Sequence, residues 1–219
     1  GEQAARAGML AIAMVQGRGH IVAPFGGAQG RLSTNPIVVA APTTDPAQPF
    51  VLDMATSVAA GGKLRVADAA GNQLPENWAL DPDGRPTRDP AMIDGGGALL
   101  PLGGPAGHKG FGLSLAVSAL AGALAPQDAL GTHRGSSTFM LAVSIEGLRE
   151  PTTYQEVFGS FLEYVRETPR QPDVEEIVVP GELERRSRDR KMKDGILLDD
   201  GTWQRLADSA KEVGIAPLK

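Results

Sequence analysis

The stretch that most constrains the fold runs from Leu99 to Leu124, where a glycine-rich turn leads into an uncharged apolar segment. Apolar side chains recur along the second half, Phe111–Leu124, at the spacing of one helix face. They are Leu113, Ala116, Val117, Leu120 and Leu124. Small residues replace charges on the opposite face, so we expect a helix that is buried on most of its faces. The rest of the chain should pack around this helix.

The turn ahead of this helix contains two ionisable residues, His108 and Lys109, among several glycines. Glycine lets the backbone approach a ligand closely, and a lysine held just ahead of a helix suits an anionic group. The alternative is that Lys109 is a surface charge at the start of a helix. The turn is therefore a candidate anion site.

Composition limits the function classes. The 219 residues carry a formal net charge of −5 and a pI of about 5.3, which argues against a nucleic-acid-binding surface. The absence of cysteine excludes disulfides, thiolate metal sites and cysteine nucleophiles. The longest nearly uncharged run, 103–124, is interrupted by glycine and too short to span a bilayer. We expect a cytoplasmic protein with no membrane partner.

Apolar runs bounded by glycine and proline alternate with periodic segments, which predicts an α/β protein. The expected strands are Met9–Val15, Ile37–Ala41, Phe50–Leu52, Thr138–Ile145 and Glu176–Val179. Besides the central helix, the expected helices are Met54–Ala60 continuing towards Val66, Tyr154–Thr168, Leu183–Lys193 and one capped by Asp199 or Asp200. The last helix should turn Trp203, Leu206, Ala207, Ala210 and Val213 inward. The charged segment Leu183–Lys193 reads as a solvated surface.

Asp53 lies where the pattern changes from strand to helix. An aspartate at such a turn is either an N-cap or part of a ligand site, because α/β folds bind ligands where strands end. Both readings stay open. Three further aspartates, Asp81, Asp83 and Asp89, lack the calcium-loop order and predict a series of structural turns.

The three histidines are far apart and have no metal-ligand spacing. His20 and His133 fall in expected loops and read as solvent-facing residues. The sequence also lacks a Rossmann fingerprint, a P-loop and a nucleophile elbow. At the start, Glu2–Ala7 followed by Gly8 reads as the end of a helix whose beginning is missing, and there is no initiator methionine. We therefore expect the chain to begin within a longer structure.

Several motifs in order along the chain resemble the type 2 malate/L-lactate dehydrogenase family. They are Thr34–Pro36, Phe50–Ser57 (F-V-L-D-M-A-T-S), Gly62–Lys63, Leu80–Asp81 with Gly84–Pro90, Gly97–Pro101, His108–Leu113 (H-K-G-F-G-L), Pro180–Glu182 and Leu198–Trp203. The family includes ureidoglycolate and sulfolactate dehydrogenases. The segment Val22–Gly27 (V-A-P-F-G-G) is typical of its hydroxycarboxylate dehydrogenase branch.

The resemblance implies a mixed-sheet nicotinamide-binding domain of the sulfolactate dehydrogenase-like, non-Rossmann type with packed helices. It implies a cofactor-binding core at 1–150 and a helical segment at 151–219 that completes a second domain. The cofactor would be NAD or NADP. The cofactor-binding residues implied are Asp53, Met54, Ala55, Thr56, His108, Lys109, Pro180, Gly181 and Glu182. The alternative for Pro180–Glu182 is a turn that needs no ligand.

The function implied by the resemblance is hydride transfer between a small 2-hydroxy acid and its 2-oxo acid, in a homodimer. The family's catalytic histidines lie in a region that would precede Gly1, including one in an S-N-H-F-G-like segment. No residue of this chain is therefore assigned as catalytic, and no metal is expected. Two alternatives stay open: a reductase of cyclic 2-imino acids with the same fold, and a catalytically inactive remnant that serves as an interaction module.

Overall fold

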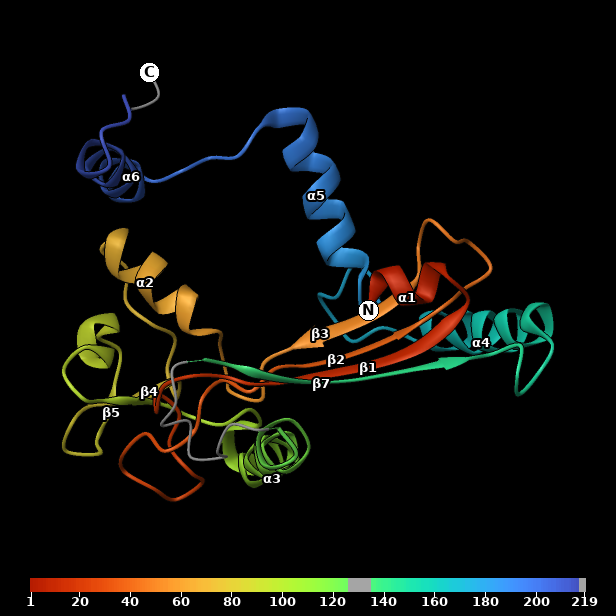
Figure 1. Cartoon of the computed structure of the whole chain (residues 1–219), viewed down its shortest axis with the longest axis horizontal. Helices are drawn as coiled ribbons and strands as arrows, with labels where there is room; N and C mark the ends of the chain where they lie inside the picture. The colour runs from red at the N-terminus through yellow and green to blue at the C-terminus, as the bar shows by residue number, and fades with distance from the viewer. Residues whose placement is uncertain (126–134, 217–219) are drawn as a thin grey trace. The chain divides into compact units, whose positions relative to one another are not determined.

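The computed structural model describes residues 1–125 and 135–216, which form two compact units (Figure 1). Unit 1 contains 1–17, 35–54, 116–125 and 135–194, and unit 2 contains 18–34, 55–115 and 195–216. The chain thus passes repeatedly from one unit to the other. The functional division at residue 150 remains a prediction.

Unit 1 is built on a four-stranded antiparallel sheet in the order β3-β2-β1-β7. Its strands are β1 (Met9–Gln16), β2 (Ile37–Ala41), β3 (Phe50–Met54) and β7 (Ser137–Ser144). β1 pairs on both sides, with Ile12 opposite both Val39 and Leu141. A continuous apolar run suits a strand whose two faces are both covered, and helical segments, α1 (Glu2–Arg6) and η3 (Ser118–Ala123), contact β1 in addition to its neighbouring strands. The four corresponding predicted strands are confirmed.

The described residues of unit 1 include three complete α-helices: α1 (Glu2–Arg6), α4 (Pro151–Arg166) and α5 (Glu182–Asp194). α1 is followed by Gly8 at φ +75°, the left-handed glycine expected after a helix end. It packs on the sheet through small side chains, since Ala5, Ala11 and Ala40 form one buried cluster. α4 begins at Glu150, whose carboxylate accepts from the backbone N–H groups of Thr152 and Thr153.

Unit 2 contains a three-stranded antiparallel sheet in the order β5-β4-β6. Its strands are β4 (Ala79–Leu80), β5 (Pro86–Thr87) and β6 (Ala98–Leu99). It includes the helices α2 (Gly61–Ala69) and α6 (Asp200–Glu212) and most of the central helix, α3 (His108–Val117). Two short 3₁₀ helices, η1 (Pro90–Ile93) and η2 (Gly104–Ala106), complete it. One core cluster of its described residues contains seven buried apolar side chains: Val22, Ala59, Leu64, Leu74, Ala79, Met92 and Leu99.

The central helix begins earlier than predicted. α3 (His108–Val117) continues into the wider π-helical turn η3 (Ser118–Ala123). His108 and Lys109 therefore lie in the first helical turn and not ahead of it. Burial on most faces was also wrong, because Leu115 is 47% exposed and Leu124 is 72% exposed. The periodicity of apolar residues located the helix, but it could not predict which of its faces the rest of the chain buries.

The predicted helix at Met54–Ala60 is wrong, and with it the N-cap role of Asp53. Asp53 lies inside β3, opposite Val38, and α2 begins only at Gly61 with Ala60 as its N-cap. Between Asp53 and Gly61, the side-chain hydroxyls of Thr56 and Ser57 form hydrogen bonds that are not helical. The Thr56 hydroxyl donates to a carbonyl of the preceding loop, and the Ser57 hydroxyl donates to the Ala59 carbonyl at 2.7 Å.

Three other expectations concern the C-terminal third. Glu176–Val179 forms no strand, because its polar groups bind α5 instead: the Val179 N–H donates to the Glu182 carboxylate at 3.0 Å. The helix after Asp199 is confirmed, with the Asp199 carboxylate accepting from the Thr202 N–H at 2.8 Å. Its apolar face is not turned inward as expected. Trp203, Leu206 and Val213 are 41%, 53% and 70% exposed.

The predicted α/β class is confirmed. The ladders between the named strands are antiparallel, and the mixed character of the sheets is limited to a parallel bridge between Val22 and Leu99. The aspartate-rich loop forms turns as predicted, with Asp81 accepting from two backbone N–H groups and Asp89 capping η1. Within 1–125 and 135–216, every helix falls short of the length and hydropathy that a membrane span requires.

Candidate functional site

In unit 1, the predicted site residues gather along β3. Asp53 is exposed near the end of the strand, and Met54 is its last residue, paired with Ile37. The turn at Pro180 borders the same strand, because the Val51 N–H donates to the Pro180 carbonyl at 3.4 Å. The structure thus brings Asp53 and Met54 to the strand edge that Pro180–Glu182 adjoins.

Gly181 is required at the centre of that turn. Its φ is +96°, a left-handed conformation that favours glycine. A Cβ atom there would lie 2.9 Å from the Arg185 guanidinium and 3.3 Å from the Val51 nitrogen. Glu182 is already engaged, since it pairs with Arg166 and accepts from the Val179 N–H. Its side chain is 14% exposed, so it stabilises the turn itself.

In unit 2, Ala55 and Thr56 meet the segment that leads into α3. The Thr56 N–H and hydroxyl both donate to the Thr34 carbonyl, at 2.9 and 3.1 Å. The Thr56 carbonyl accepts from the Leu102 N–H at 3.0 Å. Because Thr56 is 1% exposed, any ligand contact there has to use backbone atoms or the neighbouring Ala55.

Gly110, which follows His108 and Lys109 in α3, packs directly against the backbone of Leu102. A Cβ at Gly110 would lie 2.3 Å from the Leu102 carbonyl oxygen and 2.7 Å from its nitrogen, so only glycine fits this approach. His108 and Lys109 are both exposed, and no carboxylate of the described residues pairs with either. Two uncompensated basic residues in the first turn of a helix favour an anion, because the helix N-terminus is also positive.

A mainly apolar cavity lies beside His108 in unit 2. It measures about 370 Å³ and includes Phe25, Asn77, Leu100, Pro101 and Pro105 in its lining. Phe25 meets the His108 ring edge to face, with centroids 5.7 Å apart at 73°. Asn77 has a φ of +61°, uncommon for a non-glycine residue and often found at binding sites.

Sequence reasoning missed Phe25 and Arg185 as site neighbours. Phe25 lies in the V-A-P-F-G-G segment, whose aromatic residue between glycine and proline was a usable signal. Arg185 lies three residues after the P-G-E turn, and only the fold shows that its guanidinium returns to β3. Among the other histidines, His20 lies in a loop of unit 2, and His133 lies outside the described residues.

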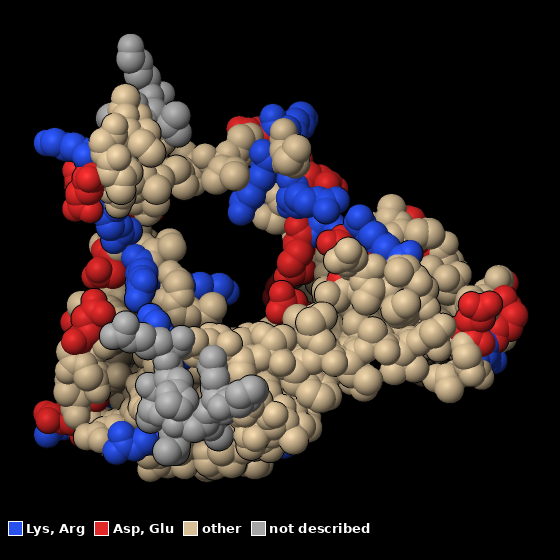
Figure 2. Space-filling model, viewed as in Figure 1, with Lys and Arg blue, Asp and Glu red and all other residues tan. Residues whose placement is uncertain are grey.

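The predicted solvated helix is confirmed in α5. Figure 2 shows basic and acidic side chains side by side over this helix. Arg186 forms an ion pair with Glu176, which lowers the pKa of that carboxyl and raises the pKa of the guanidinium. Since both side chains are about half exposed, the pair contributes little to stability.

Comparison with known proteins shows which family shares these segments. The family model for malate/L-lactate dehydrogenase matches residues 1–207. The chain belongs to the malate/L-lactate dehydrogenase family. It is 37% identical over 230 residues to a malate dehydrogenase of Pyrococcus horikoshii, with 98% of this chain and 62% of the relative aligned. The chain therefore spans about three fifths of that relative's length.

Two further similarities bear on fold and chemistry. A sulfolactate dehydrogenase structure from Methanocaldococcus jannaschii matches with a TM-score of 0.75 and 30% identity, covering 98% of this chain and 62% of that one. This confirms the predicted sulfolactate dehydrogenase-like fold. A Delta(1)-pyrroline-2-carboxylate/Delta(1)-piperideine-2-carboxylate reductase of Pseudomonas putida is 46% identical over 123 residues, which cover 56% of this chain and 35% of the relative.

Proposed function

We propose that this chain supplies the cofactor-binding part of an NAD(P)-dependent oxidoreductase that interconverts a small 2-hydroxy acid and its 2-oxo acid. The observation that carries the proposal is the family match across residues 1–207, which includes all nine predicted cofactor-binding residues. The cofactor, when bound, would supply the hydride. The chain's own residues bind and orient it.

The features of unit 2 fit part of such a cofactor. The cavity beside His108 has an apolar lining suited to a planar ring, and the cationic Lys109 suits a phosphate. Ala55 and the backbone of Thr56 adjoin this region through Leu102. We propose that His108 and Lys109 contact the phosphate-bearing part of the cofactor.

The features of unit 1 fit a polar part of the cofactor, such as a ribose or the carboxamide. Asp53 presents an exposed carboxylate that can accept from a ribose hydroxyl or a carboxamide N–H. Pro180 and Gly181 offer backbone groups beside the same strand. Protonation of the 2-oxo group requires a general acid, and no residue of this chain is assigned that role.

Cofactor binding is tested by titrating the protein with NADH and NADPH and following nicotinamide fluorescence. Lys109→Ala should raise the dissociation constant about 10- to 100-fold, because a charge-assisted hydrogen bond contributes about 1.5–3 kcal/mol. Lys193→Ala removes another exposed lysine, from α5, and should leave the constant unchanged. An unchanged constant in Lys109→Ala would refute the role of Lys109, and absence of binding to the unaltered protein would refute the proposal.

A second candidate is a reductase of cyclic 2-imino acids, favoured by the 46% identity to the Pseudomonas putida reductase. Adding NADPH with either 2-oxo acids or cyclic 2-imino acids separates the two. Turnover of 2-oxo acids supports the dehydrogenase. Turnover of cyclic imines alone supports the reductase, whereas cofactor binding without turnover of either class supports a binding module without activity of its own.

We also propose that the protein assembles as a homodimer. Exposed apolar side chains gather where β7 packs against η3: Leu120, Leu124, Met140 and Leu141 are 36%, 72%, 75% and 46% exposed. β7 is also an outer strand with no charged residue, a type of edge that readily pairs with another chain. Light scattering should give twice the chain mass, and Met140→Lys should shift it towards the monomer.

A further inference from the structure

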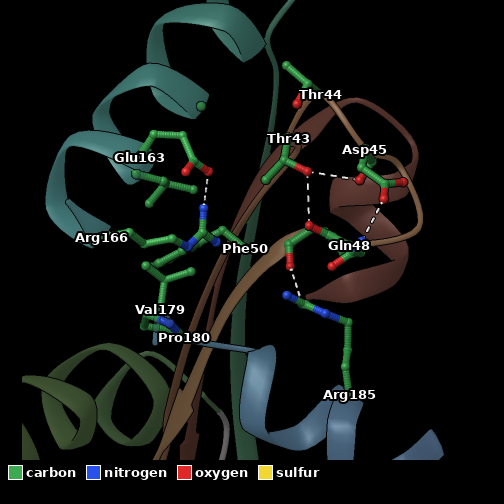
Figure 3. Close-up of a pocket in the computed structure, with 13 residues that line it drawn as sticks. Thr43, Thr44, Asp45, Gln48, Phe50, Glu163, Arg166, Val179, Pro180 and Arg185 are labelled. Atoms are coloured by element: carbon green, nitrogen blue, oxygen red, sulfur yellow. Dashed lines mark hydrogen bonds and ion pairs between the residues drawn. The ribbon is translucent and has the colours of Figure 1, made fainter. Parts of the chain in front are cut away.

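A small cavity of about 160 Å³ lies in unit 1 beside the start of β3 (Figure 3). Three segments enclose it: the loop Thr43–Phe50, the helix α4, and the turn that leads into α5. Pockets that bury a whole drug-sized ligand measure about 300–1,000 Å³. This cavity therefore accommodates one projecting group of a larger ligand.

The loop side of the cavity holds its own shape. The Thr43 hydroxyl lies 2.8 Å from the Asp45 carbonyl and 2.9 Å from the Gln48 carbonyl, within donating distance of each. The Asp45 carboxylate accepts from the Ala47 N–H at 2.9 Å and from the Gln48 side-chain amide at 2.8 Å. Figure 3 shows the contacts among Thr43, Asp45 and Gln48. Together with the Ala47 N–H, they occupy the Asp45 carboxylate and hold the loop in shape.

Two arginines line the cavity, and they differ in whether a carboxylate neutralises their charge. Arg166 on α4 lies between the carboxylates of Glu163 and Glu182, which compensate its charge. Arg185 on α5 donates to the Pro49 carbonyl at 2.9 Å, and no carboxylate of the described residues pairs with it. Its half-buried guanidinium thus combines a fixed position with an uncompensated charge.

The position of Arg185 links the cavity to the proposed cofactor site. Its guanidinium lies against Gly181, the centre of the P-G-E turn. Pro49, which anchors it, directly precedes β3, and Asp53 lies four residues further along. At about 3.3 Å per residue, this spans about 13 Å. A ligand lying along β3 can therefore contact Asp53 and Arg185 with different groups.

We propose that Arg185 binds the 2′-phosphate of NADP(H) in this cavity, so that unit 1 selects the phosphorylated coenzyme. The inference rests on the proposed function and extends it. A phosphate monoester carries about −1.5 to −2 charges at pH 7 and projects from the ribose as a terminal group. The planar guanidinium donates in a fork that matches phosphate oxygens. A bridging pyrophosphate is bound on both sides and fits such a small cavity less well.

The test compares two probes that differ only in the 2′-phosphate, adenosine 2′,5′-bisphosphate and adenosine 5′-monophosphate. In calorimetric titrations of the protein, the bisphosphate should bind at least about tenfold more tightly. Arg185→Gln should abolish this preference, and Arg185→Lys should retain part of it. Arg186→Gln is the matched control, because Arg186 is the neighbouring exposed arginine and already pairs with Glu176.

The preference should also weaken with added salt, because the contact is between charges. Circular dichroism of Arg185→Gln establishes that its fold is retained. Equal affinity for the two probes, or a preference that survives in folded Arg185→Gln, would overturn the assignment of Arg185. If NADH and NADPH then bind equally and Lys109→Ala weakens both, the proposed cofactor function stands without it. If neither nucleotide binds, both proposals fail.

Discussion

In unit 1, the candidate residues lie along β3, where side chains from distant segments hold one another by charge and hydrogen bonds. Arg166 pairs with Glu182, and Arg185 reaches the carbonyl of Pro49. In unit 2, the candidate residues lie where backbone segments touch directly, as Gly110 does against Leu102. The stability of the unit 1 part should therefore be sensitive to changes of side-chain charge. The stability of the unit 2 part should be sensitive to changes of side-chain volume.

The largest effect is expected in the core that supports the unit 2 part. Leu64 is fully buried and shares a cluster with Leu99 of β6, the strand that leads into the glycine-rich turn. Leu64→Ala should lower the free energy of unfolding by about 2–5 kcal/mol, because it removes buried methyl groups and leaves a cavity. Urea denaturation measures this loss.

Leu197→Ala is the control for that substitution, since Leu197 is 98% exposed. It should change the free energy of unfolding by no more than about 0.5 kcal/mol. A loss at Leu64 as small as that at Leu197 would show that the cluster is not the core of unit 2.

The second prediction compares glycines of the two parts directly. Gly110→Ala forces a Cβ onto the Leu102 backbone and should cost about 1–3 kcal/mol or more, since backbone cannot move aside as a side chain can. Gly159 on α4 lines the unit 1 cavity, and a Cβ there would lie 3.6 Å from Thr44, an ordinary contact. Gly159→Ala should be neutral or stabilising.

Gly112→Ala, in the same helix as Gly110, gives the matched control. A Cβ at Gly112 would meet no atom of the described residues within 4 Å beyond its own helix, so the substitution should stabilise α3 by about 0.5–1 kcal/mol through helix propensity. Thermal unfolding of the three variants orders them. If Gly110→Ala were as stable as Gly112→Ala, close backbone approach would not distinguish the unit 2 part.

Local patterns predicted most of the elements. β2 matches its predicted bounds at Ile37–Ala41, and β1 and β7 differ from theirs by single residues at their ends. These segments combine apolar runs with clear breakers, so local propensity and tertiary packing agree. The helix expected at Met54–Ala60 failed because hydroxyls of Thr56 and Ser57 bond to carbonyls outside a helix, a tertiary choice that no local pattern records.

Contacts between distant segments were beyond the sequence. Gln16, Asn35 and Ser118 form a buried cluster in unit 1, with the Ser118 hydroxyl donating to the Gln16 amide oxygen at 2.6 Å across 102 positions. Asn35 is fully buried with a φ of +36°, although the resemblance located it only as part of a T-N-P motif. In the same way, the P-G-E motif was visible in the sequence, but the approach of Arg185 to Pro49 was not.

The smallest effect concerns α4, which supplies one wall of the unit 1 cavity. The backbone N–H groups of Thr153 and Thr152 lower the pKa of the Glu150 carboxyl below its ordinary value of 4.5. A carboxyl with a lowered pKa stabilises the folded state at pH values above its ordinary pKa, and this contribution is lost as the pH falls through the folded-state pKa. The start of α4 should therefore loosen only below pH 4.5.

An NMR titration of the Thr153 amide measures this directly, because that N–H binds the Glu150 carboxylate. Its chemical shift should follow a midpoint below 4.5, and Glu150→Gln should remove the transition. Asp199 provides the counterpart in unit 2, since the Thr202 N–H lowers the pKa of that carboxyl below 3.8. A Thr153 midpoint at or above 4.5 would contradict the capping of α4 by the Glu150 carboxylate. If the Thr202 amide still showed a midpoint below 3.8, as expected for Asp199, the failure would be confined to α4 in unit 1.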